Sequence, residues 1–424
     1  MQLNNLHFPG KEGAIDLQIR NGKIHSIHPS SPKGKLTAEM GPPTRDKRSS
    51  DNQASAQSQE LPADGPAVSL SFNNALIFPG LINSHDHLDF NLFPSLGNGI
   101  YKNYTAWGKD IHTRNKKDIE AILKIPQPLR TRWGLYKNLL NGFTTVVNHG
   151  EKLQTDESLI TVFQDYHCLH SVGFEKRWRW KLNSPWKTRH PFVLHVGEGT
   201  DTAAKQEIDR LLRWNLFKRP LVGVHGVAMN EEQASSFLAL VWCPASNYFL
   251  LDGTASVDRL KNKVPLLFGT DSTLTASWNS WDQIRMAREE NKVTDQELLD
   301  MLTTTPANIW NLPGHGELTT GSRADLVIAR PREGLKVMDA FYALNPEDLL
   351  LVLHKGNIRL FDASLLEPPS AGGLLAKTSG SLPVSSFYKT SIGNSFKYIQ
   401  GDLPGLIQEI LRFYPELVFP AMTE

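Results

Sequence analysis

Cysteine is almost absent from this 424-residue sequence, which contains only Cys168 and Cys243. Two cysteines exclude a disulfide-stabilised scaffold and a zinc module built from four cysteines. Neither sign of charge is in excess, because 45 Lys and Arg residues face 44 Asp and Glu residues and the formal net charge is +1. Proteins dedicated to nucleic acids or to membrane surfaces need a basic excess. We therefore expect neither of these partners.

Long apolar runs are also missing, since no window of 18 apolar residues occurs and no transmembrane helix is predicted. The first residues, Met-Gln-Leu-Asn-Asn-Leu, show no basic stretch followed by an apolar one, so we expect no signal peptide and a cytoplasmic protein. Residues 31–66 contain no Val, Ile, Phe, Tyr or Trp, and we interpret them as a flexible insertion. The hydrophobic share of 40% is otherwise typical of a folded globular protein.

Short apolar runs alternate with helical stretches over residues 78–312. This alternation is typical of βα units with a parallel sheet, and about 235 residues is the usual size of a (β/α)8 TIM barrel. The predicted strands are residues 80–84, Thr144–Val147, Phe192–Val196, Leu221–His225, Leu238–Trp242 and Val264–Phe268. The predicted helices are Thr131–Asn141, closed by Gly142, then Asp156–Asp165, Thr202–Trp214 and Asp295–Leu302.

Strand-like sequence flanks this α/β region on both sides. Asn21-Gly22 separates two alternating apolar runs and predicts a hairpin. We predict that residues 1–77 and 313–365 together form a small β-sandwich domain built from both termini. Residues 366–424 are a C-terminal extension to which we assign no role, although its end has a helical pattern. The predicted strands of the second part are Ala324–Ala329 and Leu350–Leu360.

Several predicted strands end in a residue that can bind a metal ion or a proton. His85 and His87 lie two residues apart, so on a strand both imidazoles point to one face. At the carboxyl end of a barrel strand, that face lies at the mouth where active sites form. Neutral imidazoles are good ligands for zinc or iron. Further candidates at strand ends are His195, Glu198, His225 and Asp271.

With these residues in place, the sequence resembles the amidohydrolase superfamily, in particular its mononuclear branch of cytosine-deaminase-like and guanine-deaminase-like metal-dependent hydrolases. The resemblance covers roughly residues 1–30 and 68–362. No single motif is specific, but five motifs in the same order at compatible spacing are. The motifs are Phe78-Pro-Gly-Leu-Ile-Asn-Ser-His-Asp-His, His195-x-x-Glu198, His225-Gly, Cys243-Pro-Ala-Ser-Asn and Phe268-Gly-Thr-Asp-Ser.

This resemblance implies a catalytic role for three residues and a metal site. His85, His87, His195 and Asp271 would hold one divalent metal ion, with zinc as the first choice and iron as the second. Glu198 would act as general acid and base, His225 would orient the water or the substrate, and Asp271 would also accept a proton. The expected reaction deaminates a heterocyclic amine, or opens a cyclic amide, in a small-molecule substrate. The resemblance leaves a homo-oligomer open.

Three more residues are assigned to substrate binding. His149 follows a predicted strand, as the other site histidines do. Trp107 lies in the aromatic-rich segment after the first barrel strand, where substrate walls form. Asn247 closes the motif that begins at Cys243, a cysteine that we interpret as a packed strand residue.

The third and fourth barrel strands are the weakest part of the pattern, because only about 45 residues separate Val147 from Phe192, where two strands and two helices must fit. We assign them to residues 168–173 and 174–182. On the second of these, Lys176 would share the face of the aromatic side chains. Two alternatives follow: a binuclear amidohydrolase in which carboxylated Lys176 bridges two metals, acting on cyclic or acyl amides, and a non-catalytic scaffold on the same barrel.

Overall fold

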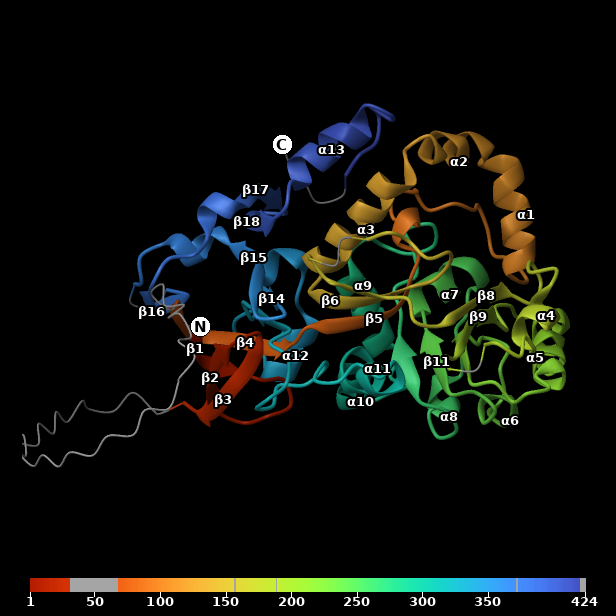
Figure 1. The fold of residues 1–424 in the computed structure, drawn as a ribbon, viewed down its shortest axis with the longest axis horizontal. Coiled ribbons are helices and arrows are strands. Elements are labelled where there is room, and N and C mark those ends of the chain that lie inside the picture. Colours follow the sequence, from red (N-terminus) through yellow and green to blue (C-terminus); the bar gives the residue numbers. More distant parts are fainter. Residues whose placement is uncertain (31–67, 156–157, 188, 371–372, 420–424) are drawn as a thin grey trace, which may run out of the picture.

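The computed structural model describes residues 1–30, 68–155, 158–187, 189–370 and 373–419, so the predicted insertion at 31–66 lies outside the described residues. Figure 1 shows two adjoining parts: a sheet that brings both ends of the chain together, and a larger α/β part that carries most of the helices. In the described part of the chain, no helix combines the length and the hydropathy that a membrane crossing requires.

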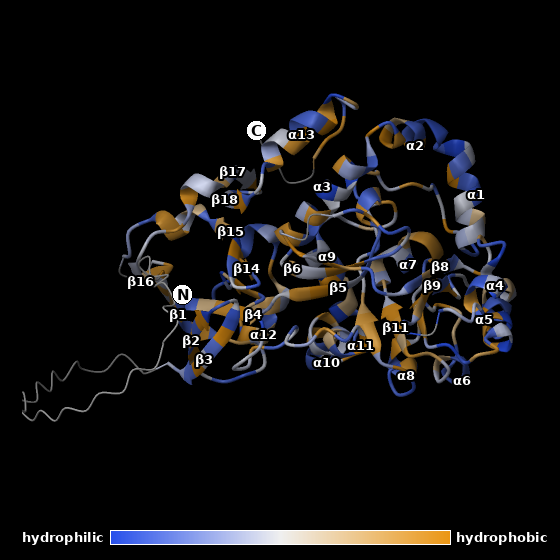
Figure 2. Ribbon diagram, in the orientation of Figure 1, coloured by the Kyte–Doolittle hydropathy of each residue, from blue (hydrophilic) through white to orange (hydrophobic). Residues whose placement is uncertain are grey.

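The larger part contains parallel strands in two sheets, with the orders β5-β6-β7 and β12-β11-β10-β9-β8. Most of these strands are buried along their whole length, which is why they are continuous apolar runs in the sequence and orange in Figure 2. This confirms the predicted α/β class. The strands are β5 (Leu81–Asp86), β6 (Phe143–Asn148), β7 (Thr161–Phe163), β8 (His167–Ser171), β9 (Phe192–Val196), β10 (Leu221–His225), β11 (Ala239–Trp242) and β12 (Leu266–Phe268).

The first and last of these parallel strands approach each other at their carboxyl ends. The backbone amide of Asp271, just after β12, donates to the carbonyl of His85 on β5 at 3.0 Å. The Asn83 side chain donates to Thr270 Oγ1 at 2.7 Å and accepts from the Thr270 amide at 3.1 Å. Two residues far apart in the sequence, His85 and Asp271, are therefore placed side by side.

Helices cover the parallel strands, and several begin or end where the sequence predicts. Helix α5 has the predicted bounds, and the Asp201 side chain caps it by accepting from the Ala204 amide at 3.0 Å. Gly142 follows the end of α3 with a φ of +84°, as expected for a helix-terminating glycine. The main helices are α1 (Tyr104–Arg114), α2 (Lys116–Leu123), α3 (Gln127–Leu140), α5 (Thr202–Trp214), α7 (Pro244–Leu251), α9 (Ser280–Glu289), α10 (Asp295–Leu302) and α12 (Val337–Tyr342). The remaining short helices here are α4 (Trp178–Leu182), α6 (Glu231–Ala234), α8 (Val257–Leu260) and α11 (Thr304–Ile309).

Two predictions between β6 and β9 are wrong. The described residues of the predicted helix 156–165 include the short strand β7 instead. The predicted strand 174–182 is a turn followed by α4. Its alternating pattern also satisfies a helix, because the two buried side chains of α4, Trp178 and Leu182, are four residues apart and share one helical face.

The second part of the molecule is one ten-stranded sheet to which both ends of the chain contribute. The Asn21-Gly22 hairpin is confirmed as the antiparallel pair β2 and β3. Residues after 366 add three strands, which the sequence pattern does not predict, and helix α13 (Leu403–Leu411), which agrees with the helical pattern near the end of the sequence. Whether this sheet is a β-sandwich domain with the predicted boundaries stays a prediction. The strands are β1 (Gln2–His7), β2 (Ala14–Arg20), β3 (Lys23–Pro29), β4 (Ser69–Pro79), β13 (Leu326–Ala329), β14 (Leu349–His354), β15 (Asn357–Asp362), β16 (Leu375–Ser379), β17 (Phe387–Ile392) and β18 (Ser395–Gln400).

A buried lysine on β18 connects the C-terminal strands to the rest of this sheet. Lys397 on β18 donates from Nζ to Asp362 Oδ2 at 2.6 Å and to the carbonyls of Glu347 and Leu349 at 2.6 and 2.7 Å. Burial lowers the pKa of Lys397, and the Asp362 carboxylate opposes that shift. The ammonium group therefore satisfies three buried acceptors at once.

We expect Lys397→Met to lower the free energy of unfolding by about 3–5 kcal/mol, because it leaves the Asp362 carboxylate buried without its partner. Urea denaturation followed by fluorescence measures the change. Lys389→Met is the matched control on the neighbouring strand, where the lysine is exposed and lies over the Phe396 ring. A loss below about 1 kcal/mol for Lys397→Met, the range of a surface pair, would contradict this role.

Candidate active site

The carboxyl ends of the parallel strands bring five of the predicted site residues together. His85 lies on β5 and His87 just after it, His195 lies on β9, His225 ends β10, and Asp271 follows β12. The Nε2 atom of His195 lies 3.3 Å from Nε2 of His87 and 3.3 Å from Nε2 of His85. Oδ1 of Asp271 lies 3.7 Å from Nε2 of His85 and 3.6 Å from Nε2 of His87.

These distances fit a metal ion among the four side chains. Two nitrogens that each bind a tetrahedral zinc at 2.0–2.1 Å lie about 3.3 Å apart. His85, His87 and His195 form one group of atoms close enough to share an ion, and His85, His225 and Asp271 form another. The donor set of imidazoles and one carboxylate is typical of zinc or iron.

Hydrogen bonding and burial determine the protonation of His85 and His195. Nδ1 of His195 lies 3.1 Å from the carbonyl oxygen of His170, so it carries the proton and Nε2 keeps its lone pair for the centre of the site. Burial lowers the pKa of His85 and of His195 well below the ordinary value, and the neighbouring histidines lower it further. Both rings are therefore neutral, the form that binds metals.

Asp271 is held as a carboxylate by its surroundings. Burial alone would raise its pKa, but the nearby His87 and His225 and a hydrogen bond from Ser246 lower the pKa overall. Ser246 Oγ donates to Oδ2 at 2.7 Å, and the Ser272 amide donates to Oδ1 at 2.9 Å. Asp271 and His225 both have a positive φ, +55° and +73°, a region that residues other than glycine adopt uncommonly.

Glu198 lies at the floor of the pocket and is almost completely buried. Burial raises its pKa well above the ordinary value, and the nearby Asp271 and Glu207 carboxylates raise it further. Its Oε2 atom lies 3.6 Å from Nε2 of His225. A carboxyl group whose pKa is raised toward neutrality can both donate and accept a proton.

A hydrogen bond with Asn247 orients the His225 ring. Nδ1 of His225 donates to Oδ1 of Asn247 at 2.9 Å, which leaves Nε2 facing Glu198 and the pocket. Asn247 is fully buried, and its amide nitrogen donates to Thr254 Oγ1 at 3.1 Å. The structure thus places Asn247 where it positions His225, and the pocket wall does not include it.

The other two predicted substrate-binding residues differ in their position. Trp107 on α1 lines the pocket beside Glu198. His149 is buried between the rings of His85 and His195, at centroid distances of 5.1 and 4.5 Å. Its Nε2 lies 3.8 Å from Cys168 Sγ, and its Nδ1 has no hydrogen-bond partner among the described residues.

The position of Lys176 contradicts the binuclear alternative. It lies in the turn before α4 and is exposed, whereas the site residues at the strand ends are buried. A carboxylated lysine that bridges two metals must project from a strand into the site, so this alternative is wrong. The structure instead has a buried lysine that the sequence did not reveal: Lys137 on α3 lies 3.3 Å from Asp86 and 2.9 Å from Asn91 Oδ1.

His170 is a second residue that the sequence prediction missed. It lies on β8, lines the pocket, and its ring centroid is 5.0 Å from that of His195. Like the other site histidines, His170 lies near the end of a strand, and this position could have marked it as a candidate. It was missed because the strands between Val147 and Phe192 are poorly defined in the sequence. Phe174, in the turn after β8, lines the same pocket.

Comparisons with known proteins agree with this geometry. The sequence profile of the amidohydrolase family matches residues 185–359, which include His195, Glu198, His225 and Asp271. A 5-methylthioadenosine/S-adenosylhomocysteine deaminase from Pyrococcus furiosus is 24% identical over 341 residues, 64% of this chain and 78% of that protein. These matches confirm the resemblance to the amidohydrolase superfamily that the sequence motifs predict.

Solved structures share the fold at low sequence identity. A guanine deaminase from C. acetobutylicum with bound guanine aligns with a TM-score of 0.59 at 16% identity, covering 84% of this chain and 99% of that chain. An adenosine deaminase from Xanthomonas campestris with bound zinc aligns with a TM-score of 0.60 at 14% identity, covering 98% of both chains. Both alignments support the α/β architecture with its parallel strands.

Proposed function

We propose that this protein is a metal-dependent amidohydrolase that removes an amino group from a heterocyclic small molecule. The observation that carries the proposal is the convergence of three Nε2 atoms and one carboxylate oxygen beside a buried carboxyl group, Glu198. The similar deaminases support the reaction class. On the same grounds we propose that the two parallel sheets form a (β/α)8 barrel, with the site at its carboxyl end.

His85, His87, His195 and Asp271 would hold the metal ion, and we propose zinc because the donor set fits it and a structure of similar fold contains it. When bound, such an ion lowers the pKa of a water molecule to about 7 and polarises a bond of the substrate.

In this proposal Glu198 transfers the first of the two protons that the attacking water loses. Its carboxylate accepts a proton from the attacking water and delivers it to a ring nitrogen of the substrate. The carbon that bears the amino group gains the oxygen, and the amino group leaves as ammonia after it has received the second proton of the water. Asp271 accepts that second proton and passes it to the leaving group. His225, whose Nδ1 proton is held by Asn247, accepts a hydrogen bond at Nε2 from the attacking water and so orients it.

The experiment that tests the proposal is an ammonia-release assay of the metal-loaded protein with a panel of amino-substituted pyrimidines, purines and triazines. We expect ammonia from at least one ring amine, and complete loss of activity after the metal is removed with a chelator. Turnover of cyclic amides without ammonia would replace deamination with ring opening. No turnover of either class by protein that holds a full complement of metal would favour the non-catalytic scaffold.

A further inference from the structure

A large apolar cavity adjoins the candidate active site, and this inference rests on the function proposed above. The pocket at Glu198 has a volume of about 90 Å³, whereas the adjoining cavity has about 690 Å³. We call the second the apolar chamber. Its own walls include Phe93, Leu96, Ile111, Ile119 and Leu123. Both spaces share Phe90, Trp107, His170, Phe174 and Leu274 as lining residues.

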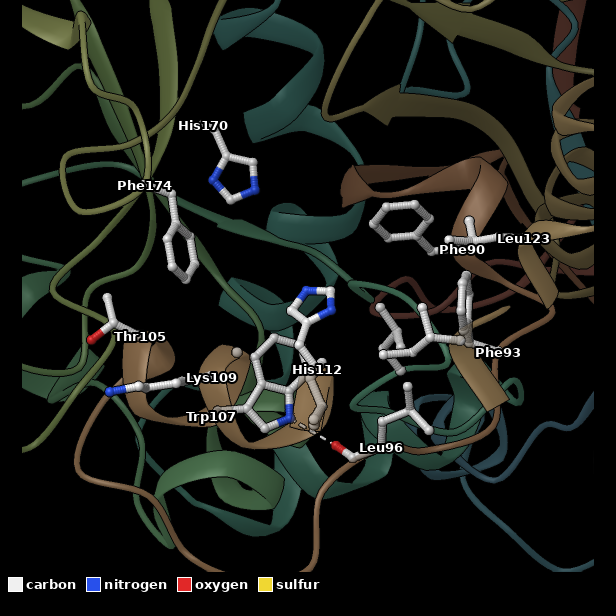
Figure 3. A pocket seen from close by; sticks show the side chains of 14 residues that line it. Phe90, Phe93, Leu96, Thr105, Trp107, Lys109, His112, Leu123, His170 and Phe174 are labelled. Atoms are coloured by element: carbon white, nitrogen blue, oxygen red, sulfur yellow. Dashed lines mark hydrogen bonds between the residues drawn. The ribbon is translucent and has the colours of Figure 1, made fainter. Parts of the chain in front are cut away.

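Because these five side chains line both spaces, the apolar chamber lies directly beside the pocket at Glu198. Trp107 and Phe174 line the small pocket together with His87 and His195, and they also line the apolar chamber. Figure 3 shows the rings of Phe90, His112, His170 and Phe174 around the space that opens beyond them. The apolar chamber is therefore the neighbouring space for any substituent of a molecule whose reacting atom lies beside Glu198.

The two volumes suit different parts of a substrate. The small pocket holds little more than the reacting group itself, whereas the apolar chamber lies within the range of about 300–1,000 Å³ that binds most of a small organic ligand. We propose that the substrate is a heterocyclic amine with a bulky apolar substituent, an alkyl or aryl group, and that this substituent occupies the apolar chamber.

The chemistry of the walls supports an apolar group over a sugar. The one indole N–H at the chamber, that of Trp107, already donates to the Leu96 carbonyl at 2.7 Å, so Trp107 offers only its carbon face (Figure 3). The polar side chains that line the chamber are Thr105, Lys109, His112 and His170, and the last three are exposed to solvent, where their polar atoms can keep water. Hydroxyl groups of a ribose would lose their hydrogen bonds to water on entering the apolar chamber.

Contacts with the catalytic segment hold the chamber wall in place. The amide of Tyr104, the first residue of α1, donates to the carbonyl of Glu198 at 3.0 Å. Its hydroxyl donates to Glu207 Oε1 at 2.6 Å and accepts from the Gly173 amide at 2.9 Å. The helix that bears Trp107 is therefore tied both to Glu198 and to the turn that bears Phe174, so the apolar chamber is preformed.

A ladder of hydroxamic acids tests the inference without turnover, because the hydroxamate binds the metal and only the tail varies. Binding of acetohydroxamic, hexanohydroxamic and 6-hydroxyhexanohydroxamic acid to the zinc-loaded protein is measured by calorimetry. Each buried methylene is worth about a fourfold gain in affinity. We expect hexanohydroxamic acid to bind more than about 30-fold tighter than acetohydroxamic acid, and the terminal hydroxyl to remove most of that gain.

Gly108 offers a variant that fills the apolar chamber. Gly108 lines the chamber, and a Cβ atom there would lie 3.1 Å from Phe174 Cζ, so in Gly108→Leu the Phe174 ring shifts by a few tenths of an ångström and the new side chain takes up part of the chamber. We expect Gly108→Leu to abolish the gain of the six-carbon tail and to leave the binding of acetohydroxamic acid unchanged. Ala106→Leu is the matched control, since Ala106 is on the same helix but exposed. Phe174→Ala, which widens the chamber, is expected to favour longer tails.

The outcomes separate this inference from the proposed function. Equal affinities along the ladder, or a gain that Gly108→Leu leaves intact, would overturn the apolar substituent even if ring amines release ammonia. A steep ladder without ammonia from any ring amine would overturn the deaminase proposal and leave the apolar chamber supported. Failure of every hydroxamate to bind would overturn both, because the chamber is argued as part of the metal site.

Discussion

Replacing Glu198 with glutamine is expected to lower kcat by about 1,000-fold while the metal content stays the same. Positioned acid and base groups contribute about 10²–10⁴-fold to such reactions. Glutamine keeps the size and one hydrogen-bonding oxygen of the side chain, but it can neither accept nor deliver the proton. Glu198 does not belong to the groups of side chains close enough to share an ion, so its loss leaves the ligands in place. Steady-state kinetics together with metal analysis measure both effects.

Glu207→Gln is the control for a general effect of a buried carboxyl group. Burial also raises the pKa of Glu207, yet Glu207 does not line the pocket and accepts a hydrogen bond from Tyr104. We expect this variant to keep kcat within about tenfold of the original protein. Equal losses for the two variants, or full activity of Glu198→Gln, would refute the acid-base role of Glu198.

His195→Ala is expected to weaken metal binding by more than about 100-fold and to abolish activity. His195 is central because its Nε2 lies 3.3 Å from those of both His85 and His87. Changes outside the ligand shell already cost about 10–100-fold in metal affinity, so the loss of a ligand costs more. Competition with a chelator of known affinity measures the change.

His170→Ala is the matched control, because it removes a neighbouring imidazole that lines the pocket and keeps the backbone carbonyl that accepts the hydrogen bond from His195. We expect this variant to retain the metal. If His195→Ala held one ion with unchanged affinity, the ligand assignment would be refuted, and the same would follow if both variants lost the metal equally.

The sequence was informative where a strand is fully buried and ends in a polar residue. His195, His225 and Asp271 each follow an uninterrupted apolar run, and parallel strands bring their carboxyl ends to one place. That rule predicted residues that the structure brings within 4 Å of one another although they lie far apart in the chain. Their catalytic roles stay predictions.

Features that depend on tertiary contacts could not be predicted in this way. Strand β7 has three residues, too few for a periodic pattern. Helix α4 was predicted as a strand because its burial depends on what Trp178 and Leu182 pack against. Lys137 is an ordinary helical lysine in the sequence, and only the fold reveals that it is buried beside Asp86. The C-terminal strand β18 depends likewise on the contact of Lys397 with Asp362.

The central claim is that His85, His87, His195 and Asp271 hold a single metal ion. Elemental analysis of the protein, purified without chelator and without added metal, tests this claim most directly. We expect about one zinc ion per chain in the original protein and much less than one in His195→Ala. A value near two ions per chain, or none after equilibration with zinc, would contradict it.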